Sequence, residues 1–187
     1  MNRILVTYFS RTGYTKRVAE RLALQLDATL CPIEEPGSRR GLLGYSRCLV
    51  EASFDIDPRI KPLAYDPGQF DLVIIGTPVW GWHLASPPRA LARRDHARMK
   101  RVAFFCTMGG SGAETAFGQL RQELGLEPVA TLALTDREID AGEIEAKLKA
   151  FADELRNAER TVSRAPAAEF TMRAARGSSN AVRGIPT

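Results

Sequence analysis

Strand-like apolar runs alternate with amphipathic helix patterns along most of the chain, and this alternation is the strongest constraint on its fold. Ile4–Phe9 and Leu72–Gly76 are short, continuous apolar runs, typical of strands buried on both faces. Further strands are predicted at Ala28–Pro32, Arg101–Cys106 and Val129–Leu134. Each parallel strand pair needs a crossover, and right-handed crossovers place helices on both faces of a sheet. The pattern therefore predicts an α/β fold, a three-layer, doubly wound five-stranded parallel sheet.

Five helices are predicted to accompany these strands. An apolar residue at every fourth position from Tyr14 to Leu26 forms one stripe of an amphipathic helix. Ser86 followed by Pro87 predicts an N-cap and a helix that runs to about Asp95. The other helices are predicted over residues 42–54, over residues 113–124 before Gly125, and after a capping box formed by Asp140 and Glu143.

Length and composition are those of one ordinary globular domain. The chain has 187 residues, of which 44% are hydrophobic and 26% are charged. Its apolar runs are much shorter than the ~20 residues of a membrane span. The start, Met1-Asn2-Arg3, leads directly into the first predicted strand without a signal-peptide pattern. We therefore expect a cytoplasmic protein without a membrane span.

The positive charge of the chain is concentrated at its carboxyl end. The formal net charge is +4, but residues 161–187 hold four arginines against one glutamate. The rest is nearly neutral and lacks the basic surface that a nucleic-acid partner requires. Residues 161–187 also have too few apolar side chains to fold alone. We expect one domain over residues 1–160 and a disordered basic tail over 161–187; the alternative is a basic arm for an acidic partner or anionic surface.

Cysteines and histidines are too few and too scattered for a metal site or a disulfide framework. The three cysteines, Cys31, Cys48 and Cys106, form no Cys-x-x-Cys pair, and the chain has two histidines. Cys106 ends a predicted strand, but the Cys-x5-Arg phosphatase pattern is broken by Gly112. We expect Cys106 to be a buried thiol. No metal ligand and no catalytic residue is assigned.

The first strand-to-helix junction carries the most specific chemical signal. Ligands of doubly wound sheets bind beyond the carboxyl ends of the strands. There the chain reads Ser10-Arg11-Thr12-Gly13-Tyr14-Thr15, which places three hydroxyls and a glycine at the positive end of a helix dipole. The loop lacks the lysine of a triphosphate loop and the GxGxxG of a dinucleotide loop, which favours a terminal monophosphate. The alternative is that Ser10 or Thr12 only caps the helix.

This junction resembles the phosphate loop of the flavodoxin family, whose pattern is T/S-x-T-G-x-T. In that family the loops after the third and fourth strands hold the isoalloxazine ring of FMN. At those places this chain has residues 76–82, which read G-T-P-V-W-G-W, and residues 107–112, which read T-M-G-G-S-G. The resemblance covers about residues 1–158 and is to the short-chain form. It implies the strand order 2-1-3-4-5 and FMN as the cofactor.

The resemblance implies that FMN contacts come from three loops. The implied residues are Ser10, Arg11, Thr12, Gly13, Tyr14, Thr15, Thr77, Pro78, Val79, Trp80, Gly81, Thr107, Met108, Gly109, Gly110 and Gly112. Trp80 and Trp82 flank a glycine on what should be an exposed turn, where an indole offers a stacking surface for a planar ring. We take Trp80 as the ring contact; one of the two tryptophans is expected to pack as core. The glycine run presents backbone groups suited to the polar edge of a flavin.

Two functions follow as expectations. The first is an FMN-binding redox protein that transfers electrons through a non-covalent flavin to a partner protein. The alternative is an NAD(P)H-dependent FMN quinone reductase, because Met108 stands where some flavodoxins have a second aromatic and one flavin face is then open. A domain that has lost FMN and serves as a scaffold is disfavoured by the intact phosphate loop. The sequence carries no signal for the oligomeric state.

Two features remain with open interpretations. His83 is expected to be a solvent-facing loop residue, with proton donation to a flavin or quinone as the alternative. Basic residues cluster between Arg89 and Arg101, with Asp95 as the acid among them. We expect this cluster to be a solvated face; the alternative is a docking surface for an acidic redox partner or for the extra phosphate of NADPH.

Overall fold

The parallel strands of the sheet pair in the order expected from the alternation. The computed structural model describes residues 3–36 and 58–164, with side chains described as far as residue 160. The parallel strands are β1 (Ile4–Tyr8), β2 (Thr29–Pro32), β3 (Leu72–Trp80), β5 (Val102–Met108) and β6 (Pro128–Thr135). They pair in the order β2-β1-β3-β5-β6, and the short β4 (His83–Leu84) pairs antiparallel with β3. The predicted order 2-1-3-4-5 of five parallel strands is confirmed.

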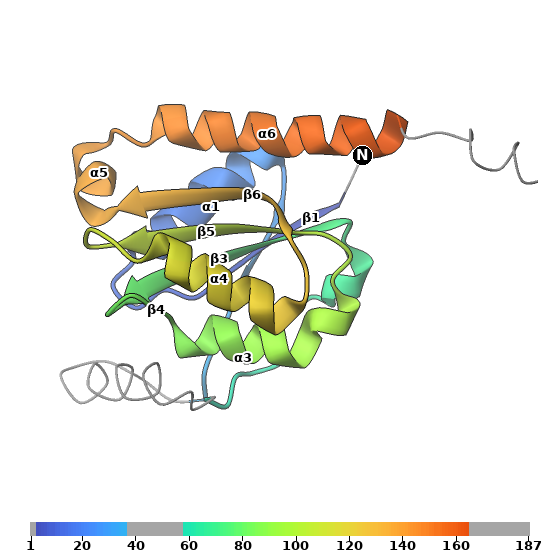
Figure 1. Ribbon diagram of the computed structural model, residues 1–187, viewed down its shortest axis with the longest axis horizontal. Helices are drawn as coiled ribbons and strands as arrows, with labels where there is room; N and C mark the ends of the chain where they lie inside the picture. Colours follow the sequence, from blue (N-terminus) through green and yellow to red (C-terminus); the bar gives the residue numbers. More distant parts are fainter. Residues whose placement is uncertain (1–2, 37–57, 165–187) are drawn as a thin grey trace, which may run out of the picture. The chain divides into compact units, whose positions relative to one another are not determined.

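Helices cover both faces of this sheet. The helices are α1 (Tyr14–Leu26), α3 (Ser86–Asp95), α4 (Ala113–Leu124), α5 (Asp136–Ala141) and α6 (Glu145–Arg164), with 3-10 turns η1 (Pro67–Gln69) and η2 (His96–Arg98). Figure 1 shows α1 and the beginning of α6 on one side of the sheet and α3 and α4 on the other. The helix predicted over residues 42–54 lies outside the described residues.

Two apolar cores separate the three layers because side chains of a strand alternate between its faces. Val6, Ile74 and Phe105 pack with α1 and α6 in one core. Leu5, Ile75 and Phe104 pack with α3 and α4 in the other. The continuous apolar runs in the sequence therefore reflect strands that are buried on both faces.

Gly76 on β3 is required by a close approach within the first of these cores. A Cβ atom at Gly76 would lie 2.1 Å from Cζ of Phe105 and 2.4 Å from Cε1. The ring of Phe105 therefore occupies the space above β3 that any larger residue at position 76 would fill.

The structure corrects the predicted loop after the third strand. β3 continues through Thr77, Pro78 and Val79 to Trp80 and then turns back into β4. The expectation that the strand ends at Gly76 and that a loop follows directly is wrong. β1 ends opposite Gly76, so Pro78 lies on a strand that has lost this neighbour, where its missing N–H is tolerated. In the same way, Thr107 and Met108 belong to β5 rather than to the following loop.

Two predicted helix starts are also corrected. The N-cap of α3 is Ala85, and Ser86 is already helical. The capping box lies at Thr135 and Glu138, five residues before the predicted one. Thr135 Oγ1 accepts from the Glu138 N–H at 3.2 Å, and Glu138 Oε2 accepts from the Thr135 N–H at 2.8 Å. Asp140 lies inside the short helix that this box starts, so it caps nothing.

The chain divides into two compact units, residues 1–155 and residues 156–187. In the second unit the described residues continue α6 to Arg164, four residues past the predicted boundary at residue 160. Residues 165–187 are not described, and the domain boundary stays a prediction. Over residues 3–36 and 58–164, no helix is both long enough and apolar enough to span a membrane.

Candidate functional site

Three segments that sequence analysis selected follow or end the central strands at the carboxyl edge of the sheet (Figure 1). We call residues Ser10–Thr15, between β1 and α1, the phosphate loop. We call Val79–Leu84, from the end of β3 through β4, the tryptophan hairpin, and Thr107–Gly112, from the end of β5 to α4, the glycine loop. Because neighbouring parallel strands end at the same edge, the topology brings the three segments to one side of the sheet.

The phosphate loop starts α1 without any side-chain cap. Gly13 is the N-cap residue, with φ 101°, a left-handed conformation that favours glycine. Ser10 Oγ accepts from the Gly13 N–H at 3.2 Å, one residue before the helix begins. The alternative reading of Ser10 or Thr12 as a helix cap is therefore wrong. The first turn holds no acidic residue, and a Cβ at Gly13 would meet nothing within 4 Å. The positive end of the α1 dipole faces open space without a carboxylate of its own helix.

The two threonine hydroxyls of the phosphate loop have different surroundings. Thr12 is exposed. Thr15 is only 1% exposed, and its Oγ1 lies 2.8 Å from Oγ1 of Thr107, which is 2% exposed. This hydrogen bond joins the phosphate loop to the glycine loop.

Tyr14 ties the phosphate loop to α5. Its hydroxyl donates to Asp140 Oδ2 at 2.7 Å, and Arg17 donates to Asp140 Oδ1 at 3.1 Å. These two hydrogen bonds hold the pKa of the Asp140 carboxyl below its ordinary value, the tyrosine bond being the larger cause. At Asp136 on the same helix, burial and then the nearby Asp140 charge raise the carboxyl pKa.

The two tryptophans of the hairpin lie in unlike environments. Trp80 is half-buried on β3, packs against the core and meets Phe9 edge to face at 6.0 Å between ring centroids. Trp82 is 64% exposed, and its Nε1 donates to Ser111 Oγ at 2.9 Å. The expectation that both lie on an exposed turn is wrong for Trp80. One tryptophan was expected to pack as core; Trp80, the one selected as the ring contact, is half-buried and packs against the core.

Backbone geometry explains this difference. Gly81 and Trp82 both have positive φ, 54° and 66°, as the two central residues of a type I′ hairpin turn require. Glycine adopts this conformation freely, but a bulky residue does so at a cost and needs support from its surroundings. The hydrogen bond from Trp82 to Ser111 supplies part of that support.

Gly112 interlocks the glycine loop with the tryptophan hairpin. It has φ 108°, and a Cβ there would lie 2.8 Å from Cα of Trp82 and 2.9 Å from Cγ1 of Val79. Only glycine fits between these atoms. A Cβ at Gly109 or Gly110 would meet nothing within 4 Å, so the middle of the loop is open.

Comparison with known proteins agrees with this arrangement. Residues 3–128 match the flavodoxin family. The chain belongs to the flavodoxin family. No curated protein matches this flavodoxin-family chain significantly.

Several solved structures resemble the chain. A flavoprotein from Lactobacillus acidophilus, solved in complex with FMN, is 25% identical with a TM-score of 0.63; the match covers 75% of this chain and 98% of that one. A candidate flavoprotein from Bacteroides eggerthii is 27% identical, also with a TM-score of 0.63, over 81% of this chain and 99% of that one. Oxidised flavodoxin 1 from Bacillus cereus, 17% identical with a TM-score of 0.50 over 83% and 97% of the two chains, shows the shared fold.

His83 of this flavodoxin-family chain is hydrogen-bonded to α4. It lies half-buried in β4, which corrects the expectation of a solvent-facing loop residue. Gln119 Oε1 accepts from the Leu84 N–H at 2.8 Å, which leaves its amide nitrogen 3.2 Å from Nδ1 of His83. The glutamine thereby fixes both residues of β4 to α4.

Cys106 is fully buried in β5, as expected. Burial, with a smaller contribution from the Glu114 charge, raises the pKa of its thiol to about 12. The thiol stays protonated at neutral pH and is a poor nucleophile.

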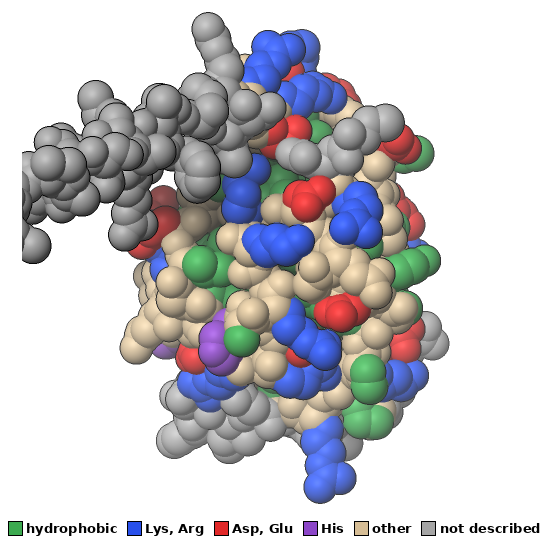
Figure 2. All heavy atoms as spheres, turned by 90° about the vertical axis from the view of Figure 1, so that its right-hand side faces the viewer, with side chains coloured by type: hydrophobic (Ala, Val, Ile, Leu, Met, Phe, Trp, Pro, Cys, Tyr) green, Lys and Arg blue, Asp and Glu red, His purple; other side chains and the backbone are tan. Residues whose placement is uncertain are grey.

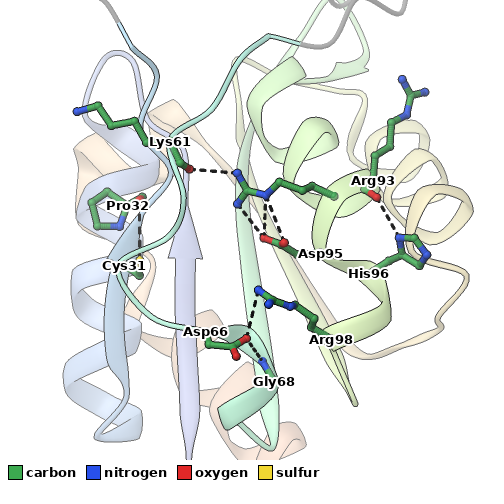
Figure 3. Close-up of polar contacts among 10 residues, drawn as sticks. Cys31, Pro32, Lys61, Asp66, Gly68, Arg93, Asp95, His96 and Arg98 are labelled. Carbon is green, nitrogen blue, oxygen red and sulfur yellow. Dashed lines mark hydrogen bonds and ion pairs between the residues drawn. The ribbon is translucent and has the colours of Figure 1, made fainter.

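The basic residues between Arg89 and Arg101 are not a free cationic face. Arg89 is 3% exposed. Arg93 donates twice to Glu123, at 2.8 and 2.6 Å, and Arg94 bonds to Asp95. Figure 3 shows the guanidinium of Arg98 directed at the Asp66 carboxylate, 3.6 Å away. Sequence analysis found Asp95 as the acid within this basic cluster. In the fold, Glu123 and Asp66, which are distant in sequence, also pair with its arginines.

Surface charge is mixed elsewhere as well. Figure 2, which faces the right-hand side of Figure 1, shows Lys and Arg side chains interspersed with Asp and Glu. Within the basic cluster itself, Lys100 pairs with Asp71 at 3.9 Å. Within the described ranges, no group of three or more His, Cys, Asp or Glu side chains is placed to hold a metal ion.

Sequence analysis missed the threonine pair and the tight hairpin turn at Gly81 and Trp82. The hydroxyl contact joins residues 92 positions apart and leaves no local pattern. The turn did leave a signal, because a glycine-containing pair between two strand-like runs is typical of a tight hairpin.

Proposed function

We propose that this chain binds FMN non-covalently at the carboxyl edge of its sheet and works as a redox protein that passes electrons through the flavin. The observation that carries the proposal is the phosphate loop, with its uncapped helix start, left-handed Gly13 and adjacent hydroxyls. The FMN complex of the Lactobacillus flavoprotein, which is 25% identical, supports the choice of ligand.

The residues present suit the phosphate of FMN. A phosphate monoester offers oxygen acceptors, and the first-turn N–H groups of α1 have no acceptor within their own helix. The hydroxyls of Ser10, Thr12 and Thr15 add donors, and Arg11 adds a cation. The open space at Gly13 leaves room for an anion beside the backbone. Tyr14 serves by anchoring the loop to Asp140.

The other two segments suit a flat ring with a polar edge. In this proposal Thr77, Pro78 and Val79 form the wall beneath the hairpin, and Trp80, Gly81 and Trp82 border the ring. The backbone of Met108, Gly109, Gly110 and Gly112 serves its polar edge, where the absence of side chains at three of these positions permits close approach. Both tryptophans remain candidates for the stacking contact: Trp80 as predicted, and Trp82 because its indole is exposed.

The bound flavin would supply the electron chemistry, while this chain supplies binding, orientation and the surrounding charges. The buried Cys106 thiol, with its pKa of about 12, is not suited to a redox or nucleophilic step beside it. A partner protein would receive or deliver the electrons. The mixed surface charges give no reason to expect a strongly acidic or strongly basic docking partner.

An NAD(P)H-dependent quinone reductase is the second candidate. The observation that favours it is the open middle of the glycine loop, where Gly109 and Gly110 present no side chain and would leave one face of the ring accessible. The reductase needs a nicotinamide to approach that face, whereas the electron carrier needs only a partner protein.

Visible absorption under anaerobic conditions tests both candidates. The protein is incubated with FMN, freed of unbound flavin, and its spectrum is measured before and after NADPH is added. Retained flavin that stays oxidised supports the electron carrier, and rapid bleaching supports the reductase. If no flavin is retained, the proposal fails.

A further inference from the structure

The buried hydroxyl pair of Thr15 and Thr107 connects two separate parts of the proposed FMN site. Thr15 lies in the first turn of α1, and Thr107 lies at the end of β5. Ala103 and Phe105 of β5 pack in the core that α1 shares. Since alternate residues of a strand share a face, Thr107 also points toward α1. Its hydroxyl reaches Thr15 Oγ1 at 2.8 Å.

Proton counting decides the direction of this hydrogen bond when a phosphate is bound. A hydroxyl has one proton, and a phosphate dianion has only acceptor oxygens. If Thr15 donates its proton to the phosphate, it can hydrogen-bond to Thr107 only as the acceptor. Thr107 must then be the donor across the 2.8 Å contact.

We infer that Thr107 is a positioning residue for phosphate binding: its hydroxyl donates to Thr15 Oγ1, holds that side chain in one rotamer and leaves the Thr15 proton directed at the phosphate of the ligand. This inference rests on the proposed function. It gives Thr107 a role through Thr15 rather than at the flavin ring. Chained hydroxyls polarise each other, so the Thr15 bond to the phosphate is strengthened.

Neighbouring threonines show that this arrangement is specific to Thr107. Thr77, also buried at the end of its strand, donates to the Pro78 carbonyl at 2.9 Å and is thereby committed to its own strand. Thr7 on β1 is fully buried, and its Oγ1 has no hydrogen-bond partner. Thr7 is therefore a matched control, because it is a buried threonine whose hydroxyl makes no hydrogen bond to any other group in the described part of the chain.

The test compares two ligands that differ only in the phosphate, FMN and riboflavin. Their dissociation constants are measured by flavin fluorescence for wild type, Thr107→Val, Thr107→Ser and Thr7→Val, with folding checked by circular dichroism. We expect Thr107→Val to weaken FMN binding about tenfold while riboflavin binding stays unchanged. Thr107→Ser, which retains the hydroxyl, and Thr7→Val are expected to bind FMN within about twofold of wild type.

The remaining outcomes overturn the inference in distinguishable ways. Unchanged FMN binding by folded Thr107→Val means that Thr15 needs no support. Tighter FMN binding means that Thr15 donates to Thr107 and that this bond competes with the phosphate. Equal weakening for FMN and riboflavin places the role of Thr107 at the ring. In these three cases wild type still binds FMN and the proposed function stands, whereas wild type that binds no FMN overturns both.

Discussion

The phosphate loop lies at the same edge of the sheet as the tryptophan hairpin and the glycine loop, which we call the ring-side segments because the proposed flavin ring would lie against them. Different contacts hold the phosphate loop and the ring-side segments in shape. The phosphate loop spans six residues, with Gly13 at the start of α1 and Ser10 bonded to the Gly13 N–H. The tryptophan hairpin and the glycine loop hold each other, through the tight fit of Gly112 against Trp82 and the bond from Trp82 to Ser111. Local contacts give the first its turn, and the bonds from Tyr14 to Asp140 and from Thr15 to Thr107 tie it to the rest of the fold, whereas tertiary packing shapes the other two. The comparison predicts different ligand sensitivities for the two regions.

The largest effect is expected at Gly76, in the central strand β3. Gly76→Ala places a Cβ 2.1 Å from the Phe105 ring, and we expect the free energy of unfolding to fall by about 2–3 kcal/mol in urea denaturation. Gly110→Ala is the control, because its Cβ meets nothing within 4 Å; its stability should stay within about 0.5 kcal/mol of wild type. Equal stability of the two variants would mean that Phe105 moves aside without cost.

A change at Gly112 should affect the ring-side region as a whole. Gly112→Ala meets the Trp82 backbone at 2.8 Å from a residue with φ 108°, so the hairpin and the glycine loop must shift. We expect FMN and riboflavin affinities to fall together by about tenfold in fluorescence titrations. Gly118→Ala on α4, whose Cβ lies 4.0 Å from a flexible arginine, should leave both affinities unchanged. Loss of FMN binding alone would contradict the division into two regions.

A change at Thr12 should affect the phosphate alone. Its side chain is exposed in the phosphate loop. Thr12→Ala removes one donor, and we expect FMN binding about fivefold weaker with riboflavin binding unchanged. Thr131→Ala, an exposed threonine on β6, is the control. A parallel loss for riboflavin would show that the phosphate loop also shapes the ring site.

The capping box of α5 also lies at this edge of the sheet, and we expect it to affect stability but not FMN binding. Hydrogen bonds from Lys147, the larger cause, and from Thr135 hold the pKa of Glu138 at about 2. A carboxyl whose pKa is lowered on folding stabilises the protein fully above its unfolded pKa of about 4.3. That contribution is lost as the pH falls from about 4.5 to 2. Glu138→Gln should reduce the fall in melting temperature over this window and leave FMN affinity at pH 7 unchanged. A variant with the same pH profile as wild type would contradict this assignment.

Much of the fold could be read from short patterns. The runs at β1 and β3 are apolar on both faces, which predicted buried parallel strands, and the fourfold spacing from Tyr14 to Leu26 predicted α1 to within a residue. The errors concern the ends of elements, namely where β3 ends and where the capping box lies. Pro78 was placed in a loop that follows a strand ending at Gly76, but β3 continues through it to pair with β4. Asp140 was interpreted as the cap of the last helix, but it lies inside α5, a separate short helix that the Thr135 and Glu138 pair starts.

By itself the sequence determined the alternation of strands and helices and the position of the phosphate loop, because each depends on residues within one or two turns of each other. Only the tertiary structure decided which tryptophan is exposed, which acids neutralise Arg93 and Arg98, and that Thr15 meets Thr107. Those contacts join residues 29 to 92 positions apart. They depend on strand order and register, which set what lies opposite each side chain, and no local pattern encodes that.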